Sequence, residues 1–246
     1  MLRALLAVLA ALSFSAAAAP VQVAVAANMA APMQKIAAGF QAATGHQAVV
    51  SLGSTGKFYA QVRNGAPFEV LLAADDETPA RLEREGHAVE GTRFTYAIGR
   101  LALWSADPAL VDAQGSVLRR HPHGRLAIAD PRLAPYGAAA VEVLTRVGVL
   151  AAWQPHFVQG ENIGQAFQFV ATGNAPIGFV ALAQVMEEGR IARGSGWVVP
   201  ADLHAPLKQD AVLLQRGASN AAAAALLHYL RSDAARAVLR GYGYAF

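Results

Sequence analysis

The sequence predicts an α/β protein built on mainly parallel sheets. Strand and helix patterns alternate along the chain after its first twenty residues. Short apolar, valine-rich runs such as residues 21–26 are typical of strands buried on both faces. One unit also recurs, in which a strand leads through a short loop of Gly, Ser, Asn or Tyr into the start of a helix. Alternating units of this kind favour the α/β class.

The first part of the chain contains three strand–helix units. Apolar residues recur at helical spacing from Met29 to Phe40, and Gly45 ends that helix. A later helix is expected to begin at Thr78 as its cap and to run to Gly86. The expected strands are residues 21–26, 49–50 and 70–73, and a further helix opens near Lys57.

The second part continues the alternation, and no flexible linker divides the chain. The expected strands are residues 98–104, 126–129, 177–180 and 212–214. The expected helices follow the turn at 134–137 up to Gly148, cover 164–172, and begin near Asn220 and Asp233. Because no linker is present, any two lobes must be joined by strands that cross between them.

Residues 1–18 have the pattern of a signal peptide. Arg3 precedes a short apolar run at residues 5–14, and three alanines at 16–18 suit signal peptidase. The run is shorter than the roughly 20 apolar residues that a membrane-spanning helix needs. The sequence contains no cysteine, which excludes disulfides, thiolate metal sites and a lipid-modified N-terminal cysteine. We therefore expect a periplasmic protein without a lipid anchor.

Charge and motifs argue against nucleic-acid binding and catalysis. The formal net charge of +3 is dispersed and forms no Lys/Arg stripe. The chain lacks the G-x-S-x-G, P-loop and G-x-G-x-x-G motifs. His121 and His123 flank a proline, which favours a surface turn over a metal site. The acidic residues 75–77 are more typical of a solvent-exposed helix start than of a functional carboxylate cluster. We expect no catalytic residue, no direct ligand to a metal cation and no cofactor.

Four strand-to-helix loops are the candidate binding elements. Ligands of open α/β sheets bind beside the helix starts, where unpaired N–H groups and the helix dipole favour anions. The loops carry almost no charge, with Lys57 beside the second and Glu161 before the fourth, so they suit a small, fully deprotonated anion. Each loop alone is more typical of an ordinary cap or turn. The loops are Ala27-Asn28, Ser54-Thr55-Gly56, Tyr136-Gly137 and Asn162-Ile163-Gly164.

Taken together, these loops and several further motifs resemble the periplasmic molybdate-binding proteins of ABC importers. No single motif is specific, but their order and spacing fit the family over essentially the whole chain after residue 18. The further motifs are Asn64-Gly65-Ala66-Pro67, Ala73-Ala74-Asp75, Asp130-Pro131, Gly178-Phe179-Val180-Ala181 and Arg240-Gly241-Tyr242-Gly243.

The resemblance implies the two-lobed periplasmic-binding-protein fold of type II, with the ligand in the cleft between lobes. Residues 19–97 and 205–246 would form lobe 1, and residues 98–204 lobe 2. The implied ligand is molybdate or tungstate held by neutral hydrogen bonds, and the implied partners are the membrane permease subunits, with the chain itself a monomer. By position, the ligand residues would be Asn28, Thr55 and the neighbouring Ser54 from lobe 1, and Tyr136 and the Ile163 backbone N–H from lobe 2.

Two departures leave the donor set and the anion open. Some members have a ligand-binding tyrosine where Ala181 stands, and others have a hydroxyl residue in place of Asn28, whose amide can still donate. Sulfate or phosphate binding on the same architecture is the nearest alternative. An enzyme on a two-lobed scaffold and a ligand-sensing regulator domain are further ones, disfavoured by the missing nucleophile–base pair and by the export signal.

The export signal gives a first testable prediction. Protein recovered from the periplasm of an expressing bacterium should lack about the first 18 residues, because signal peptidase removes them. Intact-mass spectrometry measures this directly. A full-length chain retained in the cytoplasm would contradict the prediction.

Overall fold

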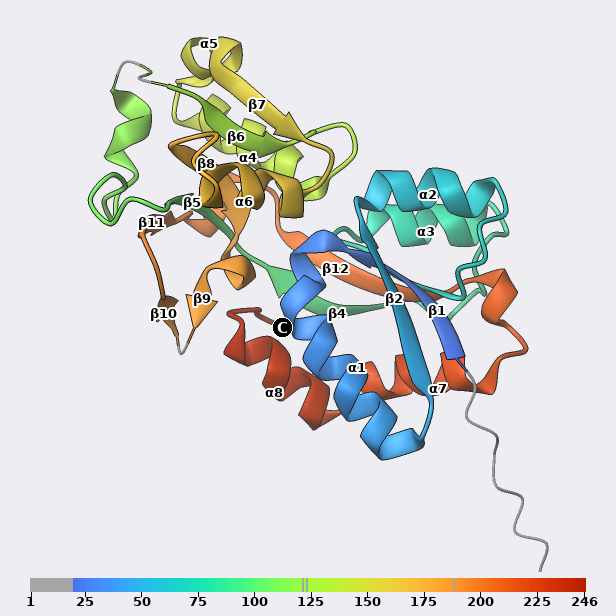
Figure 1. Cartoon of the computed structure of the whole chain (residues 1–246). Helices are drawn as coiled ribbons and strands as arrows, with labels where there is room; N and C mark the ends of the chain where they lie inside the picture. Colours follow the sequence, from blue (N-terminus) through green and yellow to red (C-terminus); the bar gives the residue numbers. More distant parts are fainter. Residues whose placement is uncertain (1–19, 121, 123, 188) are drawn as a thin grey trace, which may run out of the picture.

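The computed structural model of the chain describes residues 20–120, 122, 124–187 and 189–246, so the expected signal peptide and both His121 and His123 lie outside the described residues. It is an α/β protein with two five-stranded sheets in separate lobes (Figure 1). The sheet of the first lobe has the order β2-β1-β3-β12-β4. Its strands are β1 (Pro20–Ala26), β2 (Gln47–Gly53), β3 (Val70–Leu72), β4 (Phe94–Gly99) and β12 (Leu207–Leu213).

Helices cover both faces of this first sheet, as the alternation of residues along β1 requires. Val21, Val23 and Val25 pack with residues of α1, α7 and α8, whereas Ala24 faces the core formed with α2 and α3. Figure 1 shows these two helix groups on opposite sides of the strands. The helices are α1 (Ala30–Thr44), α2 (Thr55–Arg63), α3 (Glu77–Arg84), α7 (Ala221–Leu230) and α8 (Asp233–Gly241).

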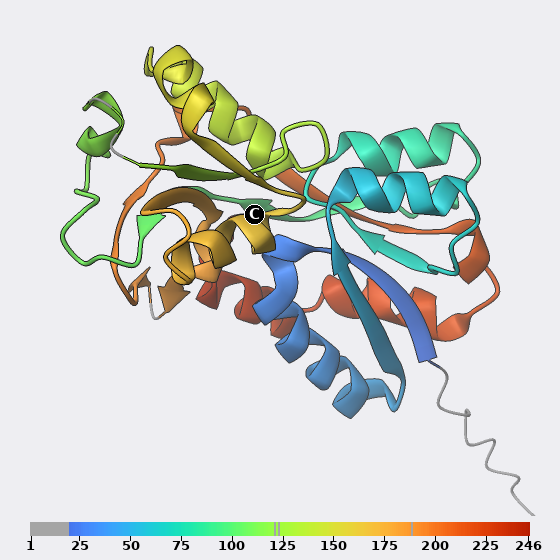
Figure 2. The same ribbon diagram turned by 45° about the horizontal axis from the view of Figure 1, so that its top comes forward.

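The sheet of the second lobe has the order β11-β5-β8-β6-β7 and is also covered on both faces. Leu101 and Leu103 pack in the core that includes residues of α4, whereas Ala102 and Trp104 pack with residues of α6. Figure 2 shows α4 (yellow-green) and α6 (gold) on opposite sides of the strands of this lobe. The strands are β5 (Leu101–Ser105), β6 (Leu126–Ala129), β7 (Phe157–Gly160), β8 (Ile177–Ala181) and β11 (Ser195–Val198). The helices are α4 (Pro135–Arg146), α5 (Leu150–Trp153) and α6 (Ile163–Ala171).

Short elements complete the chain. A two-stranded hairpin is formed by β9 (Met186–Glu187) and β10 (Arg190–Ile191). The 3₁₀ helices are η1 (Ala27–Met29), η2 (Ser116–Arg119), η3 (Gln154–His156), η4 (Leu182–Gln184), η5 (Ala201–Leu203) and η6 (Gln215–Gly217).

The chain crosses between the lobes along strands. Strand β4 belongs to the first sheet and β5 to the second, with only Arg100 between them, and the chain returns from β11 to β12 through residues 199–206. The expected α/β fold with two lobes is confirmed. The sheets are mixed, however, rather than mainly parallel, because the strands next to the crossings (β4, β5, β11 and β12) pair antiparallel with their neighbours.

Several local expectations were wrong. The single strand expected at 98–104 is two strands in different sheets, since apolar periodicity does not reveal that the chain changes sheet at Arg100. Thr78 is not the cap of α3; its N–H and hydroxyl donate to the Asp75 carboxylate at 2.8 and 3.2 Å. The sequence analysis also did not expect β7 or β11, which are only four residues long.

Two kinds of feature are absent from the described residues. No helix among them is long and apolar enough to cross a membrane. The same part of the chain holds no group of three or more His, Cys, Asp or Glu side chains placed to bind a metal ion.

Candidate functional site

The five predicted ligand residues line one small cavity where the lobes meet. The space between its atoms is about 190 Å³, including the part that is open to solvent, so the cavity is small. None of the residues around it carries a charge. The lining residues are Ala26, Ala27, Asn28, Gly53, Ser54, Thr55, Ala74, Ala134, Pro135, Tyr136, Asn162 and Ile163.

In the first lobe, the start of α2 presents two hydroxyl groups. Ser54 is the N-cap residue but makes no side-chain capping bond, and its buried Oγ has no hydrogen-bond partner. A buried hydroxyl without a partner is costly, and it marks a place where a ligand can accept a bond. Thr55 Oγ1 accepts from the Ala74 N–H at 3.0 Å, which leaves its own proton available for donation. Thr55 is therefore not the ordinary helix cap that the sequence alone favoured.

In the second lobe, α6 presents a backbone donor. Asn162 Oδ1 caps the helix by accepting from Gly164 N–H at 2.9 Å and Gln165 N–H at 3.1 Å. The N–H of Ile163, at the first helical position, has no acceptor within the helix. The cap therefore uses the next two donors and leaves the Ile163 N–H beside the cavity, as the resemblance implied.

Tyr136 brings a side chain from the start of α4 into the cavity wall. Pro135 occupies the first turn of this helix, where its missing N–H costs nothing, and the helix has no side-chain cap. Tyr136 is only 1% exposed, and its hydroxyl accepts from Gln209 Nε2 of the first lobe at 3.0 Å. Burial raises its pKa well above the ordinary value of a phenol, so the hydroxyl stays protonated and can donate.

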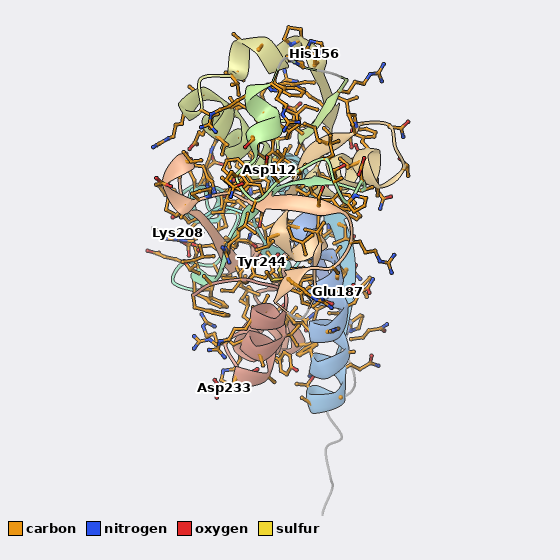
Figure 3. The ribbon with its side chains drawn as sticks, turned by 90° about the vertical axis from the view of Figure 1, so that its left-hand side faces the viewer. Asp112, His156, Glu187, Lys208, Asp233 and Tyr244 are labelled. Carbon is orange, nitrogen blue, oxygen red and sulfur yellow. The ribbon has the colours of Figure 1, made fainter. Side chains whose placement is uncertain are left out.

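A cluster of buried polar side chains adjoins the cavity, and we call Asn28, Tyr96, Tyr136, Gln209 and Tyr244 the polar floor. Asn28 Nδ2 donates to Gln209 Oε1 and to the Tyr244 hydroxyl, both at 2.9 Å. Tyr244 lies in the middle of the molecule, between the end marked by His156 and the end marked by Asp233 (Figure 3). Both amide hydrogens of Asn28 are thus used within the protein, whereas the sequence analysis expected this amide to donate to the anion.

Three contacts of different kinds bring the lobes together around the cavity. Gly56 N–H donates to Leu133 O at 2.9 Å, and a side chain on Gly56 would meet the Leu133 backbone at 3.0 Å. Lys57 Nζ lies 2.6 Å from Glu161 Oε1 at the surface. The third contact is the hydrogen bond between Gln209 and Tyr136. The cationic Lys57 is therefore paired with a carboxylate outside the cavity, and the cavity itself is left with neutral donors.

The sequence analysis missed the polar floor beyond Asn28 and Tyr136. One signal was present, because Gln209 and Asp210 lie within β12 and, unlike the exposed Lys208 before them, both are fully buried. Polar residues at such positions need specific partners. Ala181, the position where some family members have tyrosine, is buried at the end of β8 and is not among the cavity residues.

Comparisons with known proteins agree with this geometry. The family model described as bacterial extracellular solute-binding protein matches residues 21–245. The molybdate-binding protein ModA of Azotobacter vinelandii is 56% identical over 233 residues, covering 95% of this chain and 92% of that protein. ModA of Rhodobacter capsulatus is 51% identical over 234 residues, covering 95% and 91%.

A solved structure gives the same answer for the fold. The periplasmic molybdate-binding protein of Azotobacter vinelandii superposes with a TM-score of 0.88 at 41% identity. The superposition covers 92% of this chain and 99% of that one. With two lobes, a neutral cavity between them and a family match over nearly the whole described chain, this protein belongs to the bacterial extracellular solute-binding protein family.

Proposed function

We propose that this chain is the solute-binding component of an ABC importer, that it binds molybdate, and that tungstate is an alternative ligand of similar shape and charge. The observation that carries the proposal is the small, uncharged cavity where the lobes meet. It has an unpartnered Ser54 hydroxyl in its wall and the starts of α2, α4 and α6 around it. The two relatives above 50% identity, both named molybdate-binding proteins, support the choice of anion.

The donor set suits a tetrahedral dianion that carries no proton. In the proposal, Ser54, Thr55 and Tyr136 donate through hydroxyls and Ile163 through its backbone N–H, so that bonds reach the anion from both lobes. Asn28 lies beside the anion with its amide held by the polar floor. Hydrogen bonds to an ionised group are the strong ones, and here they replace the water that the anion loses.

Other readings have less support from the lining residues. Hydrogen phosphate carries a proton that needs an acceptor. No carboxylate lines the cavity, and the side-chain acceptor that it offers is the neutral, unpartnered Asn28 Oδ1. An enzyme would need a base beside a nucleophile, and neither hydroxyl of α2 has one among the cavity residues. Sulfate shares the charge and shape of molybdate and differs mainly in size, so it is the alternative that binding experiments must address.

The proposal includes motion of the lobes and a location. Residues 20–99 with 207–246 would move as one unit and residues 101–198 as the other, with Arg100 and residues 199–206 as the hinge. The boundary expected between residues 97 and 98 is moved to Arg100, because residues 98–99 belong to β4 of the first sheet. The contacts from Gly56 and Lys57 to the second lobe would then form on closure. We propose a monomer that works in the periplasm, as the name of the Azotobacter vinelandii structure states for that protein, and that delivers the anion to membrane permease subunits.

Calorimetric titration with molybdate, tungstate, sulfate and phosphate tests the choice of ligand. Molybdate should bind, and at a thousandfold excess over Kd it should add about 4 kcal/mol to the free energy of unfolding, because only the closed fold holds it. The melting temperature should then rise by roughly 8 °C or more. Tighter binding of sulfate than of molybdate would refute the assignment, and so would the absence of any shift with molybdate and tungstate.

Single substitutions test the donors. Thr55→Ala and Tyr136→Phe should each lower the affinity for molybdate about ten- to a hundredfold, because each removes a bond to an ionised ligand worth roughly 1.5–3 kcal/mol. Ser54→Ala should lower the affinity without lowering the melting temperature of the ligand-free protein, since its hydroxyl has no protein partner to lose.

Ser105→Ala is the matched control for these substitutions. Its hydroxyl is buried in the second lobe and donates to Pro176 O at 2.7 Å, away from the cavity. This variant should be less stable but should bind molybdate as the parent does. Parent-like affinity in Ser54→Ala, Thr55→Ala and Tyr136→Phe together would rule out the proposed donor set.

A further inference from the structure

Gln209 is a side chain of the polar floor that forms hydrogen bonds to ligand candidates of both lobes. Its Oε1 accepts from Asn28 Nδ2 at 2.9 Å, and its Nε2 donates to the Tyr136 hydroxyl at 3.0 Å. The same Oε1 also accepts from the Tyr96 hydroxyl at 2.9 Å. Gln209 is fully buried and does not line the cavity itself. Any influence on a ligand must therefore pass through Asn28 or Tyr136.

The local structure fixes the position of this amide. The register between β12 and β4 shifts between Gln209 and Asp210, so that Tyr96 has no paired residue on β12. Bulges of this kind redirect side chains and often lie next to functional sites. Asp210 anchors the strand on the other side, because its carboxylate accepts from Arg93 Nη1 and Thr95 Oγ1, both at 2.6 Å.

Gly99 leaves the space in which Gln209 and Tyr136 meet. A Cβ at this position would overlap both the Tyr136 hydroxyl and Gln209 Nε2. The last residue of β4, at the crossing between the lobes, is therefore a glycine whose missing side chain admits the contact between them. The bulge, the Asp210 anchor and this glycine are three separate features that hold one hydrogen bond between the lobes.

The direction of that hydrogen bond decides what Tyr136 can do. A phenol has one proton to donate, and its oxygen can accept. Because Gln209 Nε2 donates to the Tyr136 oxygen, that bond does not use the single Tyr136 proton. Without a ligand the Tyr244 hydroxyl accepts this proton, and a bound anion would take the place of Tyr244 as the acceptor. We propose that Gln209 is a positioning residue of the anion site, which bridges the lobes through Asn28 and Tyr136 and holds the Tyr136 hydroxyl as a donor towards the ligand. This inference rests on the proposed function.

Double-mutant cycles on the full protein test it. The parent is first titrated with molybdate, tungstate, sulfate and phosphate, and the tightest-binding anion is used throughout. Gln209→Met keeps the size of the side chain but removes its hydrogen bonds. It should weaken binding about tenfold in the parent and again in the Ser54→Ala background. In the Tyr136→Phe background the further loss should be no more than about threefold, because the hydroxyl that Gln209 orients is already gone.

Circular dichroism would show whether Gln209→Met folds. If it does not, a second variant is used in its place. Gln209→Leu fills a similar space without adding a charge and also lacks the Nε2 donor, so its effect should depend on Tyr136 in the same way. Equal losses in all three backgrounds, or no loss in any, would overturn the role of Gln209 while molybdate binding by the parent stands. A parent that binds none of the four anions would overturn the proposed function and this inference together.

Discussion

An anion taken out of water must recover in the protein the hydrogen bonds that it loses. This requirement explains both the donors of the proposed site and the two-lobed fold that brings them together. In a cavity lined with lysine or arginine, positively charged donors would replace the lost water. Here the cavity is uncharged, and its donors are hydroxyls and the first N–H groups of helices. Such donors are fixed to the backbone or to short side chains, so they can surround a small anion only if several helix starts converge.

Convergence of the helix starts explains the division into two lobes. Helix α2 follows a strand of the first sheet, whereas α4 and α6 follow strands of the second. Their starts meet because the chain crosses between the sheets at Arg100 and again after β11. The crossing strands also carry the polar floor, since Tyr96 lies on β4 and Gln209 on β12. The proposed motion of the lobes and the arrangement of the donors therefore involve the same strands.

The sequence predicted the strand–helix units and the four loops well, because apolar periodicity and loop composition are local properties. Residues 126–129 form β6 with the expected bounds, and Gly45 ends α1 in the left-handed conformation. What the sequence could not predict depends on partners distant along the chain. The split of the 98–104 strand, the antiparallel pairs and the contact of Asn28 with Gln209, 181 residues away, are of this kind.

The candidate site shows the same limit. All five predicted ligand residues lie around one cavity, which supports the order and spacing of the motifs as a guide. The chemistry of each group still depended on its neighbours. The Ser54 hydroxyl has no hydrogen-bond partner, whereas Thr55 Oγ1 accepts from the Ala74 N–H. The amide of Asn28 donates to other side chains of the protein. None of these differences can be read from the residue types.

The most direct measurement is a crystal structure of the protein grown with molybdate, with diffraction data collected at the molybdenum absorption edge. We expect one strong anomalous peak in the cavity. The oxygens around the metal should lie within hydrogen-bonding distance of Ser54 Oγ, Thr55 Oγ1, the Tyr136 hydroxyl and the Ile163 N–H. An anomalous peak at the protein surface with none in this cavity would contradict this expectation.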